Sequence, residues 1–216
     1  MGFYAEREAP PSSGAPNPPI VYSKLASFLE FCSGMKTLAK PPSFATVTRD
    51  VYPSGGAISS LTLAQAGAIS LAMASAAAHL HAAGIAHGDL YAHNILLDPA
   101  FVGPAAAGGG GGRGVAGLLA GKVKLGDLGA AFFYERATRR GDLIERVEVR
   151  SWGCLVEELL ALVGEEGGLG AGEAAALGAK LKEMSLLCGA EGGGVDKRPS
   201  FADIVAQLKP LVAAGE

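Results

Sequence analysis

The chain has 216 residues, of which 49% are hydrophobic, and 18 basic and 21 acidic side chains give it a formal net charge of −3. This length fits one domain with a substantial core. The slightly acidic balance gives no electrostatic reason to bind nucleic acid or an acidic membrane surface. The cysteines Cys32, Cys154 and Cys188 are odd in number and lie far apart, which argues against a disulfide framework or a zinc site. We therefore expect a protein of a reducing compartment, the cytoplasm.

The first third of the chain predicts a polar start, a strand and a long helix. Residues 1–19 are rich in Pro, Ser and Gly and are expected to be disordered, without the apolar run of a signal peptide. Residues 25–32 predict a strand that ends at Ser33-Gly34. Residues 64–83 predict an Ala-rich helix that ends at Gly84.

The uncharged stretch 61–86 is longer than a membrane span requires. It is mostly Ala with polar residues interspersed, and Leu and Ile, which drive membrane insertion, are few. We therefore interpret it as a buried helix of a globular domain and expect no membrane span.

The rest of the chain predicts two short strands and three more helices. The apolar run 95–97 and residues 123–125 predict strands on either side of a low-complexity Ala/Gly insertion at 103–121. Helices are expected at 148–162, 174–187 and 201–211, the last capped by Ser200 with Asp203 three residues on. Because strands and helices do not alternate, we expect an α+β fold that is mainly α, and not a doubly wound sheet.

Two short motifs carry side chains suited to phosphoryl transfer. The string His87-Gly-Asp-Leu-Tyr-Ala-His-Asn94 ends at the first short strand, and Asp127-Leu-Gly129 follows the second. Phosphoryl transfer needs a carboxylate to accept the proton of the attacking hydroxyl and oxygen ligands to hold Mg²⁺ on the phosphates. Asp89 is the candidate for the first role, and Asn94 and Asp127 are the candidates for the second. Gly129 allows a sharp backbone turn after Asp127.

In these residues the chain resembles the protein kinase family. Asp89 and Asn94 match the catalytic-loop pattern, and Asp127-Leu-Gly129 resembles the magnesium-binding motif, with Leu in place of Phe. Ser151-Trp-Gly-Cys-Leu-Val-Glu-Glu-Leu159 resembles the central buried helix of protein kinases, and Cys188 with Lys197-Arg-Pro-Ser-Phe201 resembles the closing region of the tyrosine-kinase-like branch. Within that branch the chain resembles plant and algal kinases in Pro41-Pro-Ser43, Thr48-Arg-Asp-Val-Tyr52, the loop 87–96 and Glu148-Val-Arg150.

The resemblance implies ATP and Mg²⁺ as cofactors and a kinase C-terminal lobe with its hinge strand over residues 20–212. Leu29 would be the gatekeeper, Glu30 and Cys32 would offer hinge backbone to the adenine, and Leu96 would form the floor of the adenine site. No glycine-rich loop or strand Lys precedes the hinge, so we expect a truncated N-terminal lobe. We also expect the chain to associate with a partner through the surface that such a lobe would cover.

Several residues depart from the family pattern. Gly88 stands where the family has Arg, Tyr91 where it has Lys, and Glu148 where it has the Asp that opens the central helix. Arg198 is expected to pair with an acidic residue that closes the activation segment, and Glu145 is the nearest candidate. Because groups that stabilise phosphate charge are missing, we expect impaired activity.

Three functional interpretations remain open, together with simpler roles for the histidines. The chain is an ATP-dependent protein kinase acting on a protein Ser/Thr or Tyr hydroxyl, an inactive pseudokinase that serves as a binding or scaffold module, or a small-molecule phosphotransferase. Aminoglycoside and choline kinases share the His-Gly-Asp…Asn loop, but the central helix and Arg198-Pro-Ser-Phe201 favour a protein kinase. We expect His87 to be packed in the core and His93 to face solvent.

Overall fold

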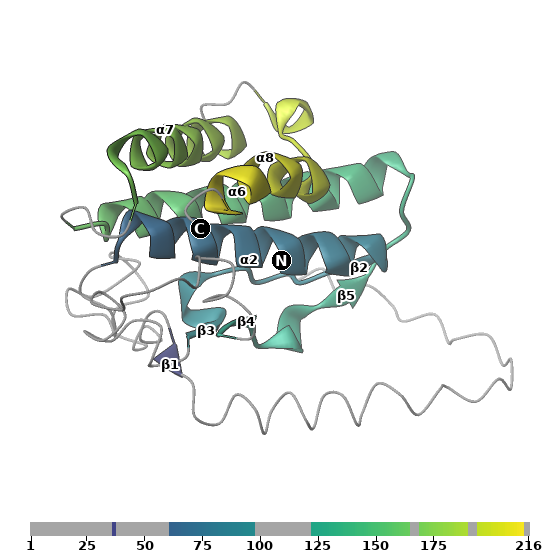
Figure 1. Ribbon diagram of the computed structural model, residues 1–216. Helices are drawn as coiled ribbons and strands as arrows, with labels where there is room; N and C mark the ends of the chain where they lie inside the picture. The colour runs from purple at the N-terminus through teal and green to yellow at the C-terminus, as the bar shows by residue number, and fades with distance from the viewer. Residues whose placement is uncertain (1–35, 38–60, 98–121, 165–168, 190–193, 214–216) are drawn as a thin grey trace, which may run out of the picture. The chain divides into compact units, whose positions relative to one another are not determined.

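The computed structural model describes residues 36–37, 61–97, 122–164, 169–189 and 194–213. Figure 1 shows their elements in chain order. The strands are β1 (Lys36–Thr37), β2 (Ile85–Ala86), β3 (Ile95–Leu97), β4 (Val123–Leu125) and β5 (Phe132–Phe133). The α-helices are α2 (Leu63–Ala82), α6 (Arg139–Ala161), α7 (Ala171–Cys188) and α8 (Phe201–Ala213). Short 3₁₀ helices cover Ala92–Asn94, Leu128–Ala130 and Val195–Lys197. This composition confirms an α+β fold that is mainly α.

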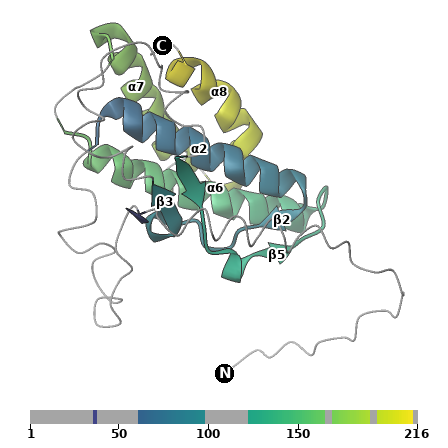
Figure 2. The same cartoon turned by 60° about the horizontal axis from the view of Figure 1, so that its bottom comes forward.

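Helix α2 lies at the centre of the described part, with the strands on one side and α7 and α8 on the other (Figures 1 and 2). It begins with a reciprocal cap in which Gln65 N donates to the Thr62 hydroxyl and Thr62 N donates to the Gln65 side chain. Although α2 is long and apolar enough to cross a membrane, half of its apolar window is buried inside the protein. Its buried residues, among them Ile69 and Met73, join one core with residues of α6, α7 and α8, as expected of a core helix.

Helix α6 begins at Arg139, whereas the sequence predicted a helix from Glu148. The Thr138 hydroxyl accepts a hydrogen bond from Gly141 N and caps this earlier start. The prediction followed the apolar run, which marks the part of α6 that holds all of its buried residues except Gly141. At its middle, the buried Trp152 ring donates from Nε1 to the Ser70 carbonyl of α2 at 3.0 Å, which ties α6 to α2.

Small residues let the helices approach one another closely. A Cβ on Gly67 of α2 would lie 2.8 Å from the Leu177 side chain of α7. A Cβ on Gly153 of α6 would lie 2.8 Å from the Cys188 side chain.

The predicted helices at 174–187 and 201–211 are confirmed as α7 and α8, and Ser200 and Asp203 make the expected reciprocal cap.

The strands form two small antiparallel sheets. One has the order β1-β3-β4 and the other pairs β2 with β5. In the first sheet Leu97 lies opposite Val123, so β3 and β4 are the two arms of one hairpin. The strand predicted at 25–32 and the Ala/Gly insertion at 103–121 lie outside the described residues, as does the segment 1–19. The pairing of β3 with β4 places the end of the segment 87–94 beside the start of the segment 127–129.

Candidate functional site

The candidate catalytic loop, residues 87–94, follows directly from the end of α2. Gly84 with φ +70° turns the chain out of the helix into β2. Within the loop, Asn94 is buried, and its Nδ2 donates to the Asp89 carbonyl at 2.8 Å and to Asp89 Oδ2 at 2.9 Å. The structure therefore brings the predicted base Asp89 and the predicted ligand Asn94 into direct contact.

Two hydrogen bonds join this loop to the second motif. Gly126 N donates to the Asn94 carbonyl at 2.8 Å, and His87 Nε2 donates to the Gly126 carbonyl at 2.9 Å. His87 is fully buried, which confirms its expected place in the core. Asp127 follows Gly126 directly, so these bonds bring the backbone of all three predicted site residues together.

Asp127 itself has an exposed side chain and an uncommon backbone conformation. Its φ is 55° and its ψ is 75°, in the left-handed region. Its Oδ1 accepts a hydrogen bond from Gly129 N at 3.1 Å, which is the turn expected at Gly129. Asp is one of the few residues that tolerate this conformation, since its short side chain bonds to nearby backbone.

The glycine at position 88 is required by a close approach of two backbones. Its φ is +79°, and a Cβ at this position would lie 2.4 Å from the Ala130 carbonyl oxygen. The motif after Asp127 therefore packs directly on the loop that carries Asp89. A side chain such as the Arg of the family pattern does not fit in this arrangement.

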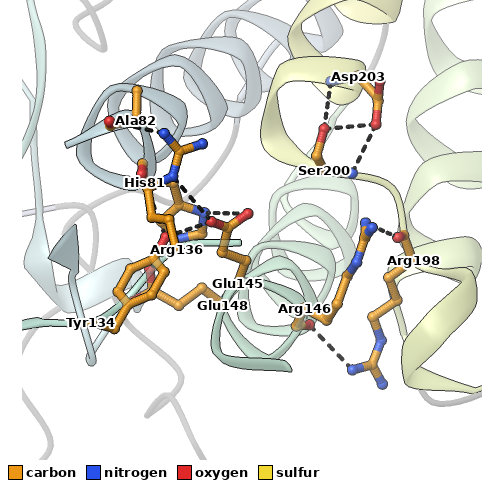
Figure 3. A network of polar contacts seen from close by, with 10 residues as sticks. All are labelled: His81, Ala82, Tyr134, Arg136, Glu145, Arg146, Glu148, Arg198, Ser200 and Asp203. Atoms are coloured by element: carbon orange, nitrogen blue, oxygen red, sulfur yellow. Dashed lines mark hydrogen bonds and ion pairs between the residues drawn. The ribbon is translucent and has the colours of Figure 1, made fainter. Parts of the chain in front are cut away.

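A buried carboxylate beneath the loop fixes its first residues. Glu148 of α6 accepts a hydrogen bond from Gly88 N at 2.5 Å, and its other oxygen contacts His81 Nε2 at 2.7 Å (Figure 3). Burial alone raises the pKa of Glu148, but hydrogen bonds from His81 and from the Gly88 and His87 amides outweigh it, so the net pKa is lowered. The sequence marked Glu148 only as a departure at a helix start. No pattern near Glu148 in the sequence signalled its contact with His81, which lies 67 residues earlier.

Glu145 does not pair with Arg198, and that prediction is wrong. Glu145 accepts a hydrogen bond from the Tyr134 hydroxyl at 2.6 Å and lies 3.8 Å from Arg136 Nε and 3.9 Å from His81 Nδ1 (Figure 3). Burial and this carboxylate raise the pKa of Tyr134. Because α6 begins before Glu145, this residue lies on the helix face toward α2.

Arg198 is held by backbone groups of α6. Arg198 Nη1 donates to the Arg146 carbonyl at 3.2 Å, and Arg146 Nη1 donates in return to the Arg198 carbonyl (Figure 3). The role of Arg198 in the described residues is therefore to join the segment before α8 to α6.

Of the other residues singled out in the sequence, His93 and Leu96 lie in the described part of the chain. His93 is about a quarter exposed, stacks on the Tyr91 ring and lies 3.7 Å from Asp89 Oδ2, so it faces the site as well as solvent. Leu96 is half-buried on β3, and a Cβ on Gly126 would lie 3.4 Å from its side chain. Leu29, Glu30 and Cys32 lie outside the described residues.

The donor set of the site fits a hard cation such as Mg²⁺. Both Asn94 Nδ2 hydrogen bonds go to Asp89, which leaves the amide oxygen of Asn94 for a ligand, and Asp127 offers a carboxylate. Among the described residues, no group of three or more His, Cys, Asp or Glu could hold a metal ion by itself. Mg²⁺ needs no such cage, because it is bound through one or two protein oxygens together with substrate phosphates and water.

The comparison with protein families agrees with this chemistry. The model of the lipopolysaccharide kinase (Kdo/WaaP) family matches residues 59–107. The described part of this match is α2 and the candidate catalytic loop with β3. No curated protein matches the chain. The match indicates a kinase-like fold and a phosphotransferase-like function, and it does not name the tyrosine-kinase-like branch of the protein kinases.

Proposed function

We propose that this chain carries the catalytic loop of an ATP-dependent phosphotransferase that acts on a protein hydroxyl. One observation carries the proposal: the buried Asn94 amide is bonded to Asp89, and its carbonyl is bonded to Gly126, directly before Asp127. These bonds join the loop that carries the proposed proton acceptor and the proposed ligand Asn94 to the segment that carries the second proposed ligand, Asp127.

The proposed chemistry assigns one role to each residue. The Asp89 carboxylate accepts the proton of the acceptor hydroxyl as the acceptor oxygen bonds to the γ-phosphorus and the bond between that phosphorus and the leaving ADP oxygen breaks. Asn94 and Asp127 would hold Mg²⁺ through their oxygens, and the bound ion supplies charge stabilisation on the phosphates. Asn94 also orients Asp89, because its Nδ2 bonds to the same carboxylate that takes the proton.

A protein acceptor is supported by the resemblance of α6 and of the segment before α8 to protein kinases. A small-molecule acceptor is the second candidate, and the match to the lipopolysaccharide kinase family favours it, because the match covers the catalytic loop itself. The third interpretation is an inactive binding module. It is favoured by Tyr91, which stands where the resemblance implies a Lys that would contact the γ-phosphate.

The test is transfer of radiolabelled γ-phosphate by the purified full chain, with Mg²⁺, to a degenerate Ser/Thr/Tyr peptide library and, in parallel, to free monosaccharides. Asp89→Asn is the control. We expect weak Mg²⁺-dependent nucleotide binding and slow transfer to peptide that Asp89→Asn abolishes. Transfer to sugars alone would select the second candidate. Transfer that survives in Asp89→Asn would remove Asp89 from the base role, and the absence of nucleotide binding would select the inactive module.

A further inference from the structure

A hollow with apolar walls opens directly beside the candidate catalytic loop. It has a volume of about 310 Å³, and the residues that line it include Gly88, Leu90, Phe132, Arg140, Ile144 and Val147. Gly88 and Leu90 are the two neighbours of Asp89 in the chain. Anything that fills this hollow therefore contacts the loop on both sides of the proposed base in the chain.

Two large apolar side chains of this hollow are exposed in the described part of the chain. Phe132 is 45% exposed and Val147 is 58% exposed, although both are large apolar side chains. A second hollow of about 360 Å³ continues the first and shares Phe132, Arg140 and Ile144 with it. Exposed apolar surface that is contiguous and concave is typical of a binding site.

One cation stands where the two hollows meet. Arg140 lines both, and no hydrogen bond or ion pair joins its guanidinium to another described residue. The neighbouring Arg139 differs, since its Nη1 lies 2.5 Å from Asp196 Oδ1. Arg140 is thus a charged donor that is free to bind an anion in the hollow.

Neither of the two carboxylates that line the hollows pairs with Arg140 in the described part of the chain. Glu148 lines the first hollow, but its oxygens are already taken by Gly88 N and His81. Glu135 lines only the second hollow. The first hollow therefore combines apolar walls, the exposed Arg140 and the buried carboxylate of Glu148, and its complement is an apolar group beside an anionic group that reaches Arg140.

We infer that the first hollow binds the acceptor of the proposed reaction, that this acceptor is a protein segment with an apolar residue next to an acidic one, and that Arg140 selects the acidic residue. The inference rests on the proposed function and names its substrate class. A protein segment fits better than an acyl chain, because Arg140 interrupts the apolar surface between the two hollows. An extended segment presents successive side chains on alternate sides, so one can enter the hollow while its neighbour meets Arg140.

The test uses fluorescence anisotropy with the full chain and a labelled peptide in which serine is followed by leucine and aspartate among glycines. Two matched peptides carry lysine for the aspartate or glycine for the leucine. We expect the aspartate peptide to bind more tightly than either and to weaken as salt is raised. Arg140→Ala should weaken binding by about fivefold, the upper range for an exposed charge pair, and Arg140→Glu should reverse the preference toward the lysine peptide.

Matched variants separate the hollow from its surroundings. Arg139→Ala removes the neighbouring cation, which already pairs with Asp196, and should leave peptide binding unchanged. Phe132→Ala should weaken binding by about tenfold, since it removes apolar surface shared by both hollows. Leu186→Ala, which shortens an exposed apolar residue of α7 outside the hollows, should have no effect.

These binding experiments test the inference independently of the proposed function, because peptide binding is measured without nucleotide. Equal binding of the aspartate and lysine peptides, or binding that survives both Arg140→Glu and Phe132→Ala, would overturn it. Binding to anionic lipid vesicles in place of the peptides would assign the hollow to a membrane surface, and self-association that Arg140→Glu abolishes would assign it to a second copy of the chain. Either result overturns the protein-segment assignment. If Asp89→Asn abolishes transfer and retains peptide binding, both proposals stand.

Discussion

The two segments that build the candidate site are held in different ways. The loop 87–94 is anchored to the core because Gly88 N donates to Glu148, which is itself bonded to His81. Within the loop, the Asn94 amide donates to the Asp89 carbonyl. The turn after Asp127 is exposed, and the Asp127 side chain is held by its own backbone at Gly129. The proposed base and the proposed ligand Asn94 thus lie on a preorganised segment, while the second proposed ligand, Asp127, lies on an exposed turn. Substitutions in the loop 87–94 and its anchor should therefore change mainly the stability of the protein, whereas substitution of Asp127 should change mainly ligand binding.

The largest effect is expected from removing the carboxylate that anchors the loop. Glu148→Ala leaves the Gly88 amide and the buried His81 ring without their partner, and should lower the free energy of unfolding by about 3 kcal/mol. Chemical denaturation measures this loss. The control is Glu157→Ala, an exposed residue of the same helix, which should change the stability by less than about 0.5 kcal/mol.

The same carboxylate predicts a pH dependence. The pKa of Glu148 is lowered in the folded protein from its ordinary 4.5, so its ionised form contributes stability that is present above pH 4.5 and is lost as the pH falls toward the folded pKa. The difference in stability between the wild type and Glu148→Gln should therefore be largest near neutral pH and shrink in acid. A difference that grows on acidification would contradict the anchoring role.

A second, smaller loss is expected where the two segments touch. Gly88→Ala places a Cβ against the Ala130 carbonyl at a positive φ, and should destabilise the protein by about 2 kcal/mol. In contrast, a Cβ on Gly172 of α7 meets no atom within 4 Å, so Gly172→Ala should stabilise the helix by up to about 1 kcal/mol. Thermal denaturation of both variants measures the contrast. Equal effects would mean that the contact between residues 88 and 130 is not made in solution.

A substitution of Asp127 tests the second segment, the exposed turn that carries the proposed metal ligand. Asp127→Asn preserves the side-chain turn to Gly129 and the tolerance for a positive φ, but removes the charge that would hold Mg²⁺. We expect a change in unfolding free energy within about 0.5 kcal/mol, together with loss of Mg²⁺-dependent nucleotide binding. Titration of a fluorescent nucleotide with and without Mg²⁺ measures the second effect. Nucleotide binding with an unchanged response to Mg²⁺ would exclude Asp127 as a ligand.

Features that depend on local sequence patterns were predicted more fully than features that depend on contacts between residues far apart in the chain. The cap at Ser200 and Asp203, the extent of the helix after residue 63 and the contact of Asp89 with Asn94 depend on residues close together in the chain, and the sequence signals them directly. The anchor formed by Glu148 and His81 joins residues that are 67 apart, and neither residue has an unusual neighbourhood in the sequence. The start of α6 was placed too late because its first turn, residues 139–142, carries three charged side chains and the dense apolar run begins only after Glu148.

The smallest effect is expected from shortening the connection between β3 and β4. Residues 103–121 lie outside the described part, so their predicted dispensability stays a prediction. Because Leu97 lies opposite Val123 in an antiparallel pair, residues 98–102 and Lys122 still suffice for a hairpin connection after the deletion. A Gly-rich segment gains little by burial and loses much entropy on ordering, and loop-closure cost changes only slowly with length. The deletion should therefore lower the melting temperature by no more than about 2 °C, which corresponds to a fraction of a kcal/mol for a domain of this size. A large drop measured by thermal denaturation would mean that the insertion packs on the core and belongs to the folded unit.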